Sequence, residues 1–247
     1  MKYPEDYINK VIQGDCLEVM KDIPDKSIDM ILCDLPYGTT ACKWDTIIPF
    51  EPLWEQYKRI IKDNGAIVLT ASQPFTSALV MSNVKMFKYE WIWEKESHSN
   101  FLNIKKQPGK RHENVCVFYK NQPTYNPQFW EGKDNHSVGN QIGKKVKREI
   151  FAGEYNIVKA REGNMKYPIS IFKFNTMGRG IGVHPTQKPV ALFEYLIKTY
   201  THEGDLVLDS CAGSGTTGIA CRNLNRNFIL IEKEQEYIDI INKRLST

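Results

Sequence analysis

The chain has 247 residues, of which 41% are hydrophobic and 25% are charged, and its formal net charge is +4. These are the proportions of a globular protein with room for one substantial core and one small insertion. They exclude a membrane-spanning protein, because no apolar run approaches the roughly 20 residues that cross a bilayer. The charged and polar start, Met1–Asp6, lacks the apolar segment of a signal peptide, which favours a cytoplasmic protein.

The cysteines form no CxxC pair and have no histidine pair at zinc-ligand spacing beside them. This pattern predicts reduced, mostly buried thiols and no metal site. The six positions are Cys16, Cys33, Cys42, Cys116, Cys211 and Cys221.

Short runs rich in β-branched residues alternate with longer amphipathic stretches, as in an α/β protein with a mostly parallel sheet. The predicted strands are Lys10–Gln13, Ile28–Cys33, Ala66–Ala71, Phe87–Trp93, Val115–Tyr119, Leu206–Asp209 and Phe228–Ile231. The predicted helices are Leu53–Lys62, Pro74–Asn83, Val190–Thr199, Thr216–Asn223 and Gln235–Arg244. The residues from Lys62 to Gly65 predict the end of a helix and a turn into the next strand.

The second predicted strand ends in an acid, a proline turn and an aromatic residue, in the order Asp34, Leu35, Pro36 and Tyr37. The amino group of a nucleobase is a poor nucleophile because its lone pair is delocalised into the ring. Two acceptors on its N–H bonds would favour a pyramidal nitrogen, and Asp34 Oδ and the Leu35 carbonyl can supply them. Pro36 holds the turn with its fixed φ, and Tyr37 offers a ring for an extruded base. The segment therefore predicts methyl transfer that depends on positioning.

The region 121–183 interrupts the alternation with Gly, Asn, Pro, basic and aromatic residues. It holds ten Lys/Arg and five Asp/Glu, a net charge of +5, so the remaining residues sum to −1. This concentration predicts a surface that contacts nucleic acid, with a solvated loop as the alternative. Trp44, in the loop Thr39–Ile48, is a candidate wedge for the space a flipped base leaves or a simple loop anchor. The basic candidates for DNA contact are Lys144, Lys145, Lys147, Arg148, Arg161 and Arg179.

The segment Leu206–Thr217 runs from a buried strand through a glycine turn into a helix. Gly213 and Gly215 lack the Cβ atoms that would keep a ligand from the backbone, and the helix start presents free N–H groups. No lysine follows the turn, and the third glycine of the dinucleotide fingerprint is missing. Glu232 ends the next strand, where an acid can bind both ribose hydroxyls. Together these features predict a nucleoside-type cofactor.

These segments resemble the motifs of DNA amino-methyltransferases. The turn that begins at Asp34 is similar to the D-P-P-Y motif, and Asp209–Gly215 is similar to the D-x-x-x-G-x-G cofactor motif. The catalytic motif comes first, an order that resembles the β group, and the likeness covers nearly the whole chain except 121–183. Leu35 departs from the usual proline. Since only its carbonyl is needed, we expect activity to survive.

Three shorter segments also resemble the family. His184–Pro189 is similar to the segment that helps to bind the methionine moiety of the cofactor. Gly14 and Asp15 resemble the position that contacts the cofactor's adenine, and His112–Asn114 resembles a recurring pattern of the group.

The resemblance implies a Rossmann-like class I methyltransferase fold, with a seven-stranded, mostly parallel sheet and helices on both faces. It implies S-adenosylmethionine as cofactor and double-stranded DNA as substrate. The catalytic half would be 1–120, the target-recognition insertion 121–183 and the cofactor-binding half 184–247. The implied catalytic residues are Asp34, Leu35, Pro36 and Tyr37. The implied cofactor-binding residues are Asp15, Asp34, Thr186, Lys188, Asp209, Cys211, Ala212, Gly213, Ser214, Gly215, Thr216, Thr217 and Glu232.

If the strands Leu206–Asp209 and Ile28–Cys33 are neighbours at the switch point of the sheet, Asp209 and Asp34 face one crevice. Cofactor and target base would then meet there.

The expected function is site-specific methylation of N6 of a flipped adenine in duplex DNA, as in restriction-modification. Cytosine-N4 methylation uses the same acceptors and stays open, although the family tends to place serine at the first motif position for cytosine. RNA base methylation and a DNA-binding module without catalysis are further alternatives. The intact Asp34, Tyr37 and Glu232 argue against the last of these. A homodimer and a cognate restriction endonuclease are open as partners, because an insertion of about sixty residues indicates a short target or help from a second subunit.

Overall fold

The computed structural model describes residues 2–40, 42, 45–133, 145–147, 154–156, 164–176 and 187–246. The chain divides into two compact units. The main unit comprises Met1–Asn126 and Ser170–Thr247, and the small unit comprises Pro127–Ile169. The small unit falls within the predicted insertion 121–183.

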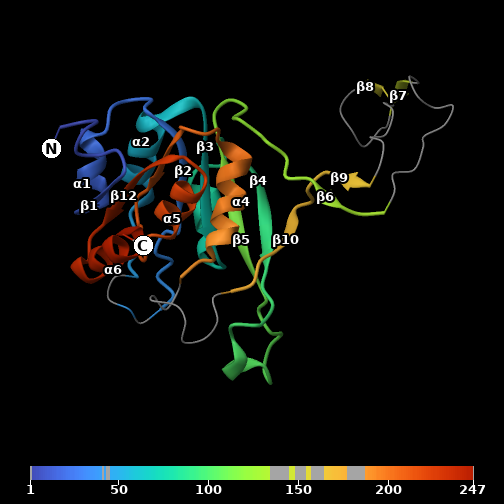
Figure 1. The fold of residues 1–247 in the computed structure, drawn as a ribbon. Helices are drawn as coiled ribbons and strands as arrows, with labels where there is room; N and C mark the ends of the chain where they lie inside the picture. The colour runs from blue at the N-terminus through green and yellow to red at the C-terminus, as the bar shows by residue number, and fades with distance from the viewer. Residues whose placement is uncertain are drawn as a thin grey trace. The chain divides into compact units, whose positions relative to one another are not determined.

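The main unit is built on an eight-stranded sheet (Figure 1). Strand β5 is antiparallel to both of its neighbours, β3 and β4, and the other neighbouring pairs are parallel. In spatial order the strands are β1 (Lys10–Gln13), β12 (Asn227–Glu232), β11 (Leu206–Asp209), β2 (Ile28–Cys33), β3 (Ile61–Ala71), β5 (His112–Phe118), β4 (Phe87–Glu94) and β10 (Ile171–Lys173).

The predicted mostly parallel α/β sheet is therefore confirmed, with one strand more than the seven expected. The additional strand is β10, from the end of the region that the sequence assigns to the insertion. Its three residues pair with Ile92–Glu94 of β4. A three-residue strand carries too short a pattern to be recognised from periodicity.

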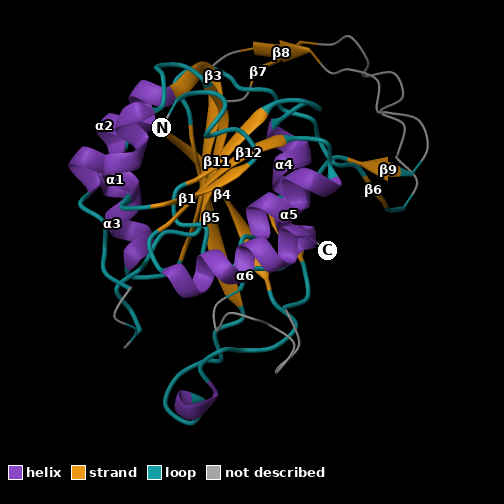
Figure 2. Ribbon diagram, turned by 60° about the vertical axis from the view of Figure 1, so that its left-hand side comes forward, coloured by secondary structure: helices purple, strands orange, loops and turns teal. Residues whose placement is uncertain are grey.

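Helices cover both faces of the sheet (Figure 2). One face carries α1 (Cys16–Val19), the 3-10 turn η1 (Met20–Asp22), α2 (Phe50–Ile60) and α3 (Phe75–Ser82). The other carries α4 (Val190–Tyr200), α5 (Thr216–Asn223) and α6 (Gln235–Ser246). None of the described helices is long and apolar enough to cross a membrane.

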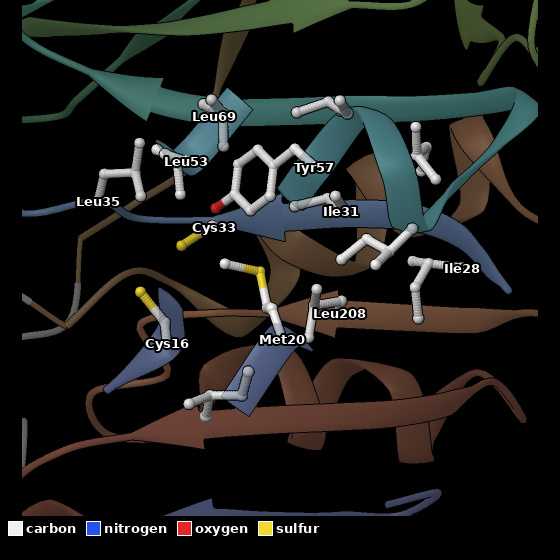
Figure 3. Close-up of a cluster of buried hydrophobic side chains, with 14 of the residues drawn as sticks. Cys16, Met20, Ile28, Ile31, Cys33, Leu35, Leu53, Tyr57, Leu69 and Leu208 are labelled. Carbon is white, nitrogen blue, oxygen red and sulfur yellow. The ribbon is translucent and has the colours of Figure 1, made fainter. Parts of the chain in front are cut away.

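Two hydrophobic clusters fill the spaces between the sheet and its helices. In β2, Ile31 and Cys33 face the first cluster, while Met30 and Leu32 face the second, as the alternation of a strand requires. Figure 3 shows Cys33 beside Tyr57 of α2 in the first cluster. Because both faces of the central strands are buried, they consist of continuous apolar runs.

The predicted turn at Lys62–Gly65 is wrong. Helix α2 ends at Ile60, and β3 runs without a break from Ile61 to Ala71. The register against β2 shifts between Ile28 and Met30, so the extra residues are taken up as an irregularity in the strand. Gly65 is required there because an added Cβ would lie 2.8 Å from the Asp29 carbonyl oxygen.

Strands β11 and β2 are neighbours at the point where the chain order of the sheet reverses. Val207 pairs with Met30 and Leu208 pairs with Ile31. The predicted adjacency is confirmed, and the carboxyl ends of both strands lie at one edge of the sheet. That edge is where open α/β sheets bind their ligands.

The described part of the small unit contains two short antiparallel pairs of strands. Strand β6 (Trp130–Glu131) pairs with β9 (Met165–Lys166), and β7 (Lys145–Lys147) pairs with β8 (Glu154–Asn156). The indole of Trp130 donates a hydrogen bond of 3.0 Å to the Tyr167 carbonyl, which ties the first pair together.

Candidate active site

A pocket of about 1040 Å³ opens at the carboxyl ends of β2 and β11. From the predicted catalytic segment it is lined by Asp34, Leu35, Pro36 and Tyr37. From the predicted cofactor set it is lined by Asp15, Lys188, Asp209, Cys211, Ala212, Gly213, Ser214, Thr216 and Glu232. The structure thus brings both predicted ends of the site to one cavity.

Asp34 is held by three donors that come from different segments. Lys188 Nζ donates to Asp34 Oδ2 at 2.6 Å, and the Tyr37 hydroxyl donates to Oδ1 at 2.7 Å. The Thr70 hydroxyl, at the end of β3, also donates to Oδ1. Burial and the negative charge of Asp34 raise the pKa of Tyr37 well above its usual value, so the phenol keeps the proton that it shares with the carboxylate.

Lys188 is only 7% exposed and bridges two carboxylates. Its Nζ also lies 3.4 Å from Glu113 Oε2, an ion pair without hydrogen-bond geometry. Burial by itself lowers the pKa of Lys188, but the charges of Asp34 and Glu113 outweigh this and raise it. Burial likewise opposes the ionised form of Glu113, yet Lys188 and Lys95 hold its pKa below the usual value.

The four side chains therefore form a buried ion chain, Lys95–Glu113–Lys188–Asp34, in which Lys95 Nζ bonds Glu113 Oε1. Lysines and carboxylates alternate along this chain. Opposite charges in a partly buried setting interact more strongly than at the surface.

The turn after Asp34 is closed by a second carboxylate. Asp45 is 8% exposed and accepts backbone N–H bonds from Gly38, Thr39 and Thr40 at 2.8, 2.9 and 2.6 Å. Burial alone would raise the pKa of Asp45, but these bonds lower it. One side of the Tyr37 ring stacks on Phe75, with centroids 5.1 Å apart, so an extruded base could meet only the side turned away from Phe75.

At the cofactor end, Glu232 accepts three backbone N–H bonds. Gly213 N donates to Oε2 at 2.8 Å, while Lys233 N and Glu234 N donate to Oε1 at 2.8 and 2.9 Å. A carboxylate oxygen accepts two hydrogen bonds readily, so Oε2 keeps capacity for a hydroxyl. Asp15 caps α1 by accepting from Leu17 N at 2.9 Å and also lines the pocket. These residues fit a nucleoside-type cofactor.

Among the expected cofactor residues that the structure describes, two do not line the pocket. Gly215 has φ +77°, and an added Cβ would lie 2.9 Å from Ile241 Cγ2, so this glycine is required by the turn and by packing against α6. Thr217 is fully buried and donates its hydroxyl proton to Asp209 Oδ2. Gly215 and Thr217 therefore stabilise the glycine turn without facing the pocket.

Several predicted residues cannot be placed. Trp44, Lys144, Arg148, Arg161, Arg179 and Thr186 lie outside the described residues. Lys145 and Lys147 belong to β7, where only the backbone is described.

Sequence reasoning missed Lys95, Thr70 and the role of Glu113, and it placed Lys188 only with the cofactor. Thr70 is the one polar side chain in the buried run Ala66–Ala71, a signal that sequence alone could have offered. Nothing in the sequence marks Lys95 and Glu113 as residues of the candidate site, because charged residues at strand ends are usually solvated.

Asp209→Asn is expected to change how stability depends on pH. Burial raises the pKa of Asp209 from 3.8 to about 6, despite bonds from Thr217 and Cys211 N. Because the folded-state pKa of Asp209 is raised, the stability that this residue contributes is fully present below its unfolded-state pKa. That stability is lost as pH rises through about 6. At ~1.4 kcal/mol per pKa unit, the wild type should lose about 2 to 3 kcal/mol relative to the variant between about pH 4 and pH 7.

Urea unfolding of both proteins at the two pH values measures this difference. Asp239→Asn, at an exposed position of α6, serves as the control and should track the wild type. Parallel pH profiles for Asp209→Asn and the wild type would contradict the prediction.

Comparison with known proteins agrees with this geometry. The family model described as DNA methylase matches residues 28–243. Type II methyltransferase M2.MboI of Moraxella bovis is 29% identical, over 95% of this chain and 86% of that protein. Type II methyltransferase M.HinfI of Haemophilus influenzae is 27% identical, over 97% of this chain and 69% of that protein. The crystal structure of the M1.HpyAVI–SAM complex is 26% identical with a TM-score of 0.66, and the match covers 96% of this chain and 99% of that one.

The sheet, its switch-point pocket and the glycine turn beside Glu232 define a class I methyltransferase that uses S-adenosylmethionine. The chain belongs to the DNA methylase family, the N6/N4 amino-methyltransferases of DNA, whose model spans most of its length.

Proposed function

We propose that this enzyme methylates N6 of an adenine flipped out of duplex DNA. The choice of adenine over cytosine is based on the acid that follows β2. The Asp34 carboxylate is in contact with Lys188, Thr70 and Tyr37. A carboxylate has about four acceptor sites, so Asp34 retains one for an amino group of the base.

The second acceptor is the carbonyl of Leu35, which lines the pocket. Among the described residues, no N–H group is bonded to it. The two acceptors would engage the two N–H bonds of the amino group, favour a pyramidal nitrogen and release its lone pair. The Leu35 side chain is 4% exposed and belongs to the core, which offsets the loss of the proline that the family motif usually has.

The cofactor contributes an electrophilic methyl group on sulfur when bound. In this proposal Glu232 Oε2 accepts a hydrogen bond from a ribose hydroxyl of the cofactor, and Asp15 lies beside the adenine of the cofactor. The backbone from Asp209 to Ser214 forms the bottom of the cofactor site. The shared pocket supports this assignment. Holding the base and the methyl donor in one cavity supplies catalysis by positioning.

Mass analysis of nucleosides tests the assignment directly. The purified protein is incubated with duplex DNA and S-adenosylmethionine, and the DNA is digested to nucleosides. We expect N6-methyladenine, and N4-methylcytosine as the only product would overturn the choice of base. A parallel reaction on structured RNA separates the DNA assignment from RNA methylation, since transfer to RNA alone would contradict it.

We further propose that residues 121–183, which contain the small unit, recognise the target sequence. The local charge of +5 supports this. The same proposal includes a cytoplasmic location, a restriction endonuclease with the same target, and a homodimer that supplements a short insertion. Sequencing the DNA of an expressing host with modified-base detection tests the target, and sedimentation tests the dimer.

A further inference from the structure

Three cysteines meet at the cofactor end of the pocket, and no step of the proposed function uses their thiols. Cys16 is the first residue of α1, Cys33 is the last residue of β2, and Cys211 follows β11 in the glycine turn. We propose that Cys16 and Cys211 form a site of reversible oxidation, and that a disulfide between them weakens binding of the cofactor. The inference rests on the assignment of this pocket to the cofactor in the proposed function.

The thiols of Cys16 and Cys211 are in direct contact. They share a hydrogen bond, and Cys211 shares another with Cys33. Cys16 and Cys33 belong to one hydrophobic cluster, and Cys211 packs against it. Figure 3 shows the sulfur atoms of Cys16 and Cys33 directed into this cluster. Two cysteines can be bridged without large backbone movement only when their side chains already face each other, and the shared hydrogen bond shows that Cys16 and Cys211 do.

Access to the pocket distinguishes this pair from the third thiol. Cys16 and Cys211 both line the pocket, although Cys16 is only 8% exposed and Cys211 is half-buried. Cys33 is fully buried and does not line the pocket. Its Sγ lies 3.4 Å from the Oγ of Ser210, which is also buried. A small oxidant that enters the pocket therefore reaches Cys16 and Cys211 before Cys33.

The contact also gives the two thiols different roles. The hydrogen bond with the Cys211 thiol is the main cause that lowers the pKa of Cys16, against burial and the charge of Asp15. Hydrogen bonds with Cys16 and Cys33, together with burial, raise the pKa of Cys211 well above its usual value. Because the thiolate is the nucleophilic form of cysteine, Cys16 reacts first and Cys211 keeps its proton until the second step.

The oxidant in this proposal is a hydroperoxide, such as hydrogen peroxide. The Cys16 thiolate attacks one peroxide oxygen, so an S–O bond forms, the O–O bond breaks, and hydroxide leaves and takes up a proton to become water. The Cys16 sulfur is then a sulfenic acid. Cys211 loses its proton and attacks this sulfur, so the S–S bond forms and the S–O bond breaks with loss of a second water. Two thiols have lost two electrons and two protons, and the peroxide has been reduced to two waters.

A bridge between these thiols changes the cofactor site. Cys16 directly follows Asp15, and Cys211 precedes Gly213, and all four residues line the pocket. The two segments follow β1 and β11, which lie on either side of β12 in the sheet, and β12 ends at Glu232. Because a covalent bond is shorter than a non-bonded contact between sulfur atoms, the bridge draws these segments together and fixes them. The space for a nucleoside between them therefore becomes smaller.

A count of free thiols tests the oxidation without DNA. The experiment uses Cys42→Ala protein, because Cys42 is exposed and would form disulfides between molecules. Removing one of the six cysteines leaves five, and hydrogen peroxide should lower the number of free thiols from five to three. Peptide mapping after alkylation of the remaining thiols should find Cys16 linked to Cys211. A dithiol reductant should restore all five thiols.

Two further substitutions in the same background separate this pair from the other cysteines. With Cys16→Ala, no disulfide should form. With Cys221→Ala, which removes a buried cysteine from the cluster on the other face of the sheet, two thiols should still be lost. A link between Cys33 and Cys211 as the main product, oxidation of Cys16 to a sulfinic acid without a disulfide, or no loss of thiols in the Cys42→Ala protein would each overturn the proposal.

Binding of the cofactor provides the second test. Oxidised Cys42→Ala protein should bind S-adenosylmethionine on the order of tenfold more weakly in calorimetry, and the dithiol reductant should restore the affinity. Conversely, at a cofactor concentration of about 100 Kd only about 1% of the protein is unoccupied. The cofactor then covers the thiols, which should be lost at least about tenfold more slowly.

Equal cofactor affinities of the oxidised and reduced protein would overturn the inference that the bridge weakens binding. The failure of the proposed function is a separate outcome. If the wild type methylated no adenine, that function would fail, whereas the thiol count and the peptide map would still decide whether this disulfide forms.

Discussion

Asp34→Ala is expected to lower the rate of methyl transfer about 10³-fold, the scale of one catalytic proton acceptor or electrostatic contact. The variant removes the side-chain acceptor for the amino group and leaves only the Leu35 carbonyl. The cofactor should still bind, because the glycine turn and Glu232 lie on other strands. The measurements are single-turnover transfer to DNA and the cofactor Kd by calorimetry.

Two companion variants sharpen this experiment. Asp34→Asn keeps the shape of the side chain and removes its charge, so it should be nearly as slow as Asp34→Ala. Glu232→Ala should show the reverse pattern, with a weaker cofactor Kd and a rate that recovers at saturating cofactor. Near-normal turnover by either Asp34 variant would contradict the proposed mechanism.

Lys188→Met is expected to destabilise the protein by about 3 to 5 kcal/mol, the cost of removing one partner from a buried ion pair. The substitution leaves Asp34 and Glu113 facing each other without the cation that neutralises them. Glu113 is 14% exposed and retains Lys95, which places the expected loss toward the lower end. Unfolding by urea at pH 7 measures the effect.

The pH dependence follows from the sign of the Glu113 shift. In the wild type the folded-state pKa of Glu113 is below the usual glutamate value of 4.5. The stability that Glu113 contributes is therefore present above that value and is lost as pH falls through the folded pKa. Without Lys188 the folded-state pKa of Glu113 should rise. The deficit of Lys188→Met should therefore be largest near neutral pH and shrink on acidification.

Adding Glu113→Gln to Lys188→Met serves as the control, since it removes the unpaired carboxylate and should recover part of the loss. A Lys188→Met protein as stable as the wild type at pH 7 would show that the ion chain does not contribute to folding.

In the proposed mechanism the ion chain also has a function. The Asp34 carboxylate is held in one orientation by its contacts with a lysine, a phenol and a hydroxyl. Such a group acts as a fixed acceptor, which suits a reaction that depends on the geometry of two hydrogen bonds.

Most of the sheet could be predicted from the chain because its central strands are continuous apolar runs ending in polar motifs. The boundaries of β1, β2 and β11 agree with the prediction to the residue. The prediction failed at Lys62–Gly65, where Asn and Gly suggest a turn but pairing with β2 keeps the backbone extended. It also missed β10, whose pairing with β4 depends on a partner far away in the chain.

The sequence by itself determined the fold class, the two motif-bearing strand ends and the acid, proline and glycine residues of the candidate site. These properties depend on neighbouring residues, since periodicity and turn chemistry act over a few positions. Only the tertiary structure decided that Lys188, which lies 154 positions from Asp34, is its ion-pair partner, and that Glu113 and Lys95 complete the ion chain. Because Coulomb energy depends on separation in space, an ion pair of this kind produces no periodic pattern in the sequence.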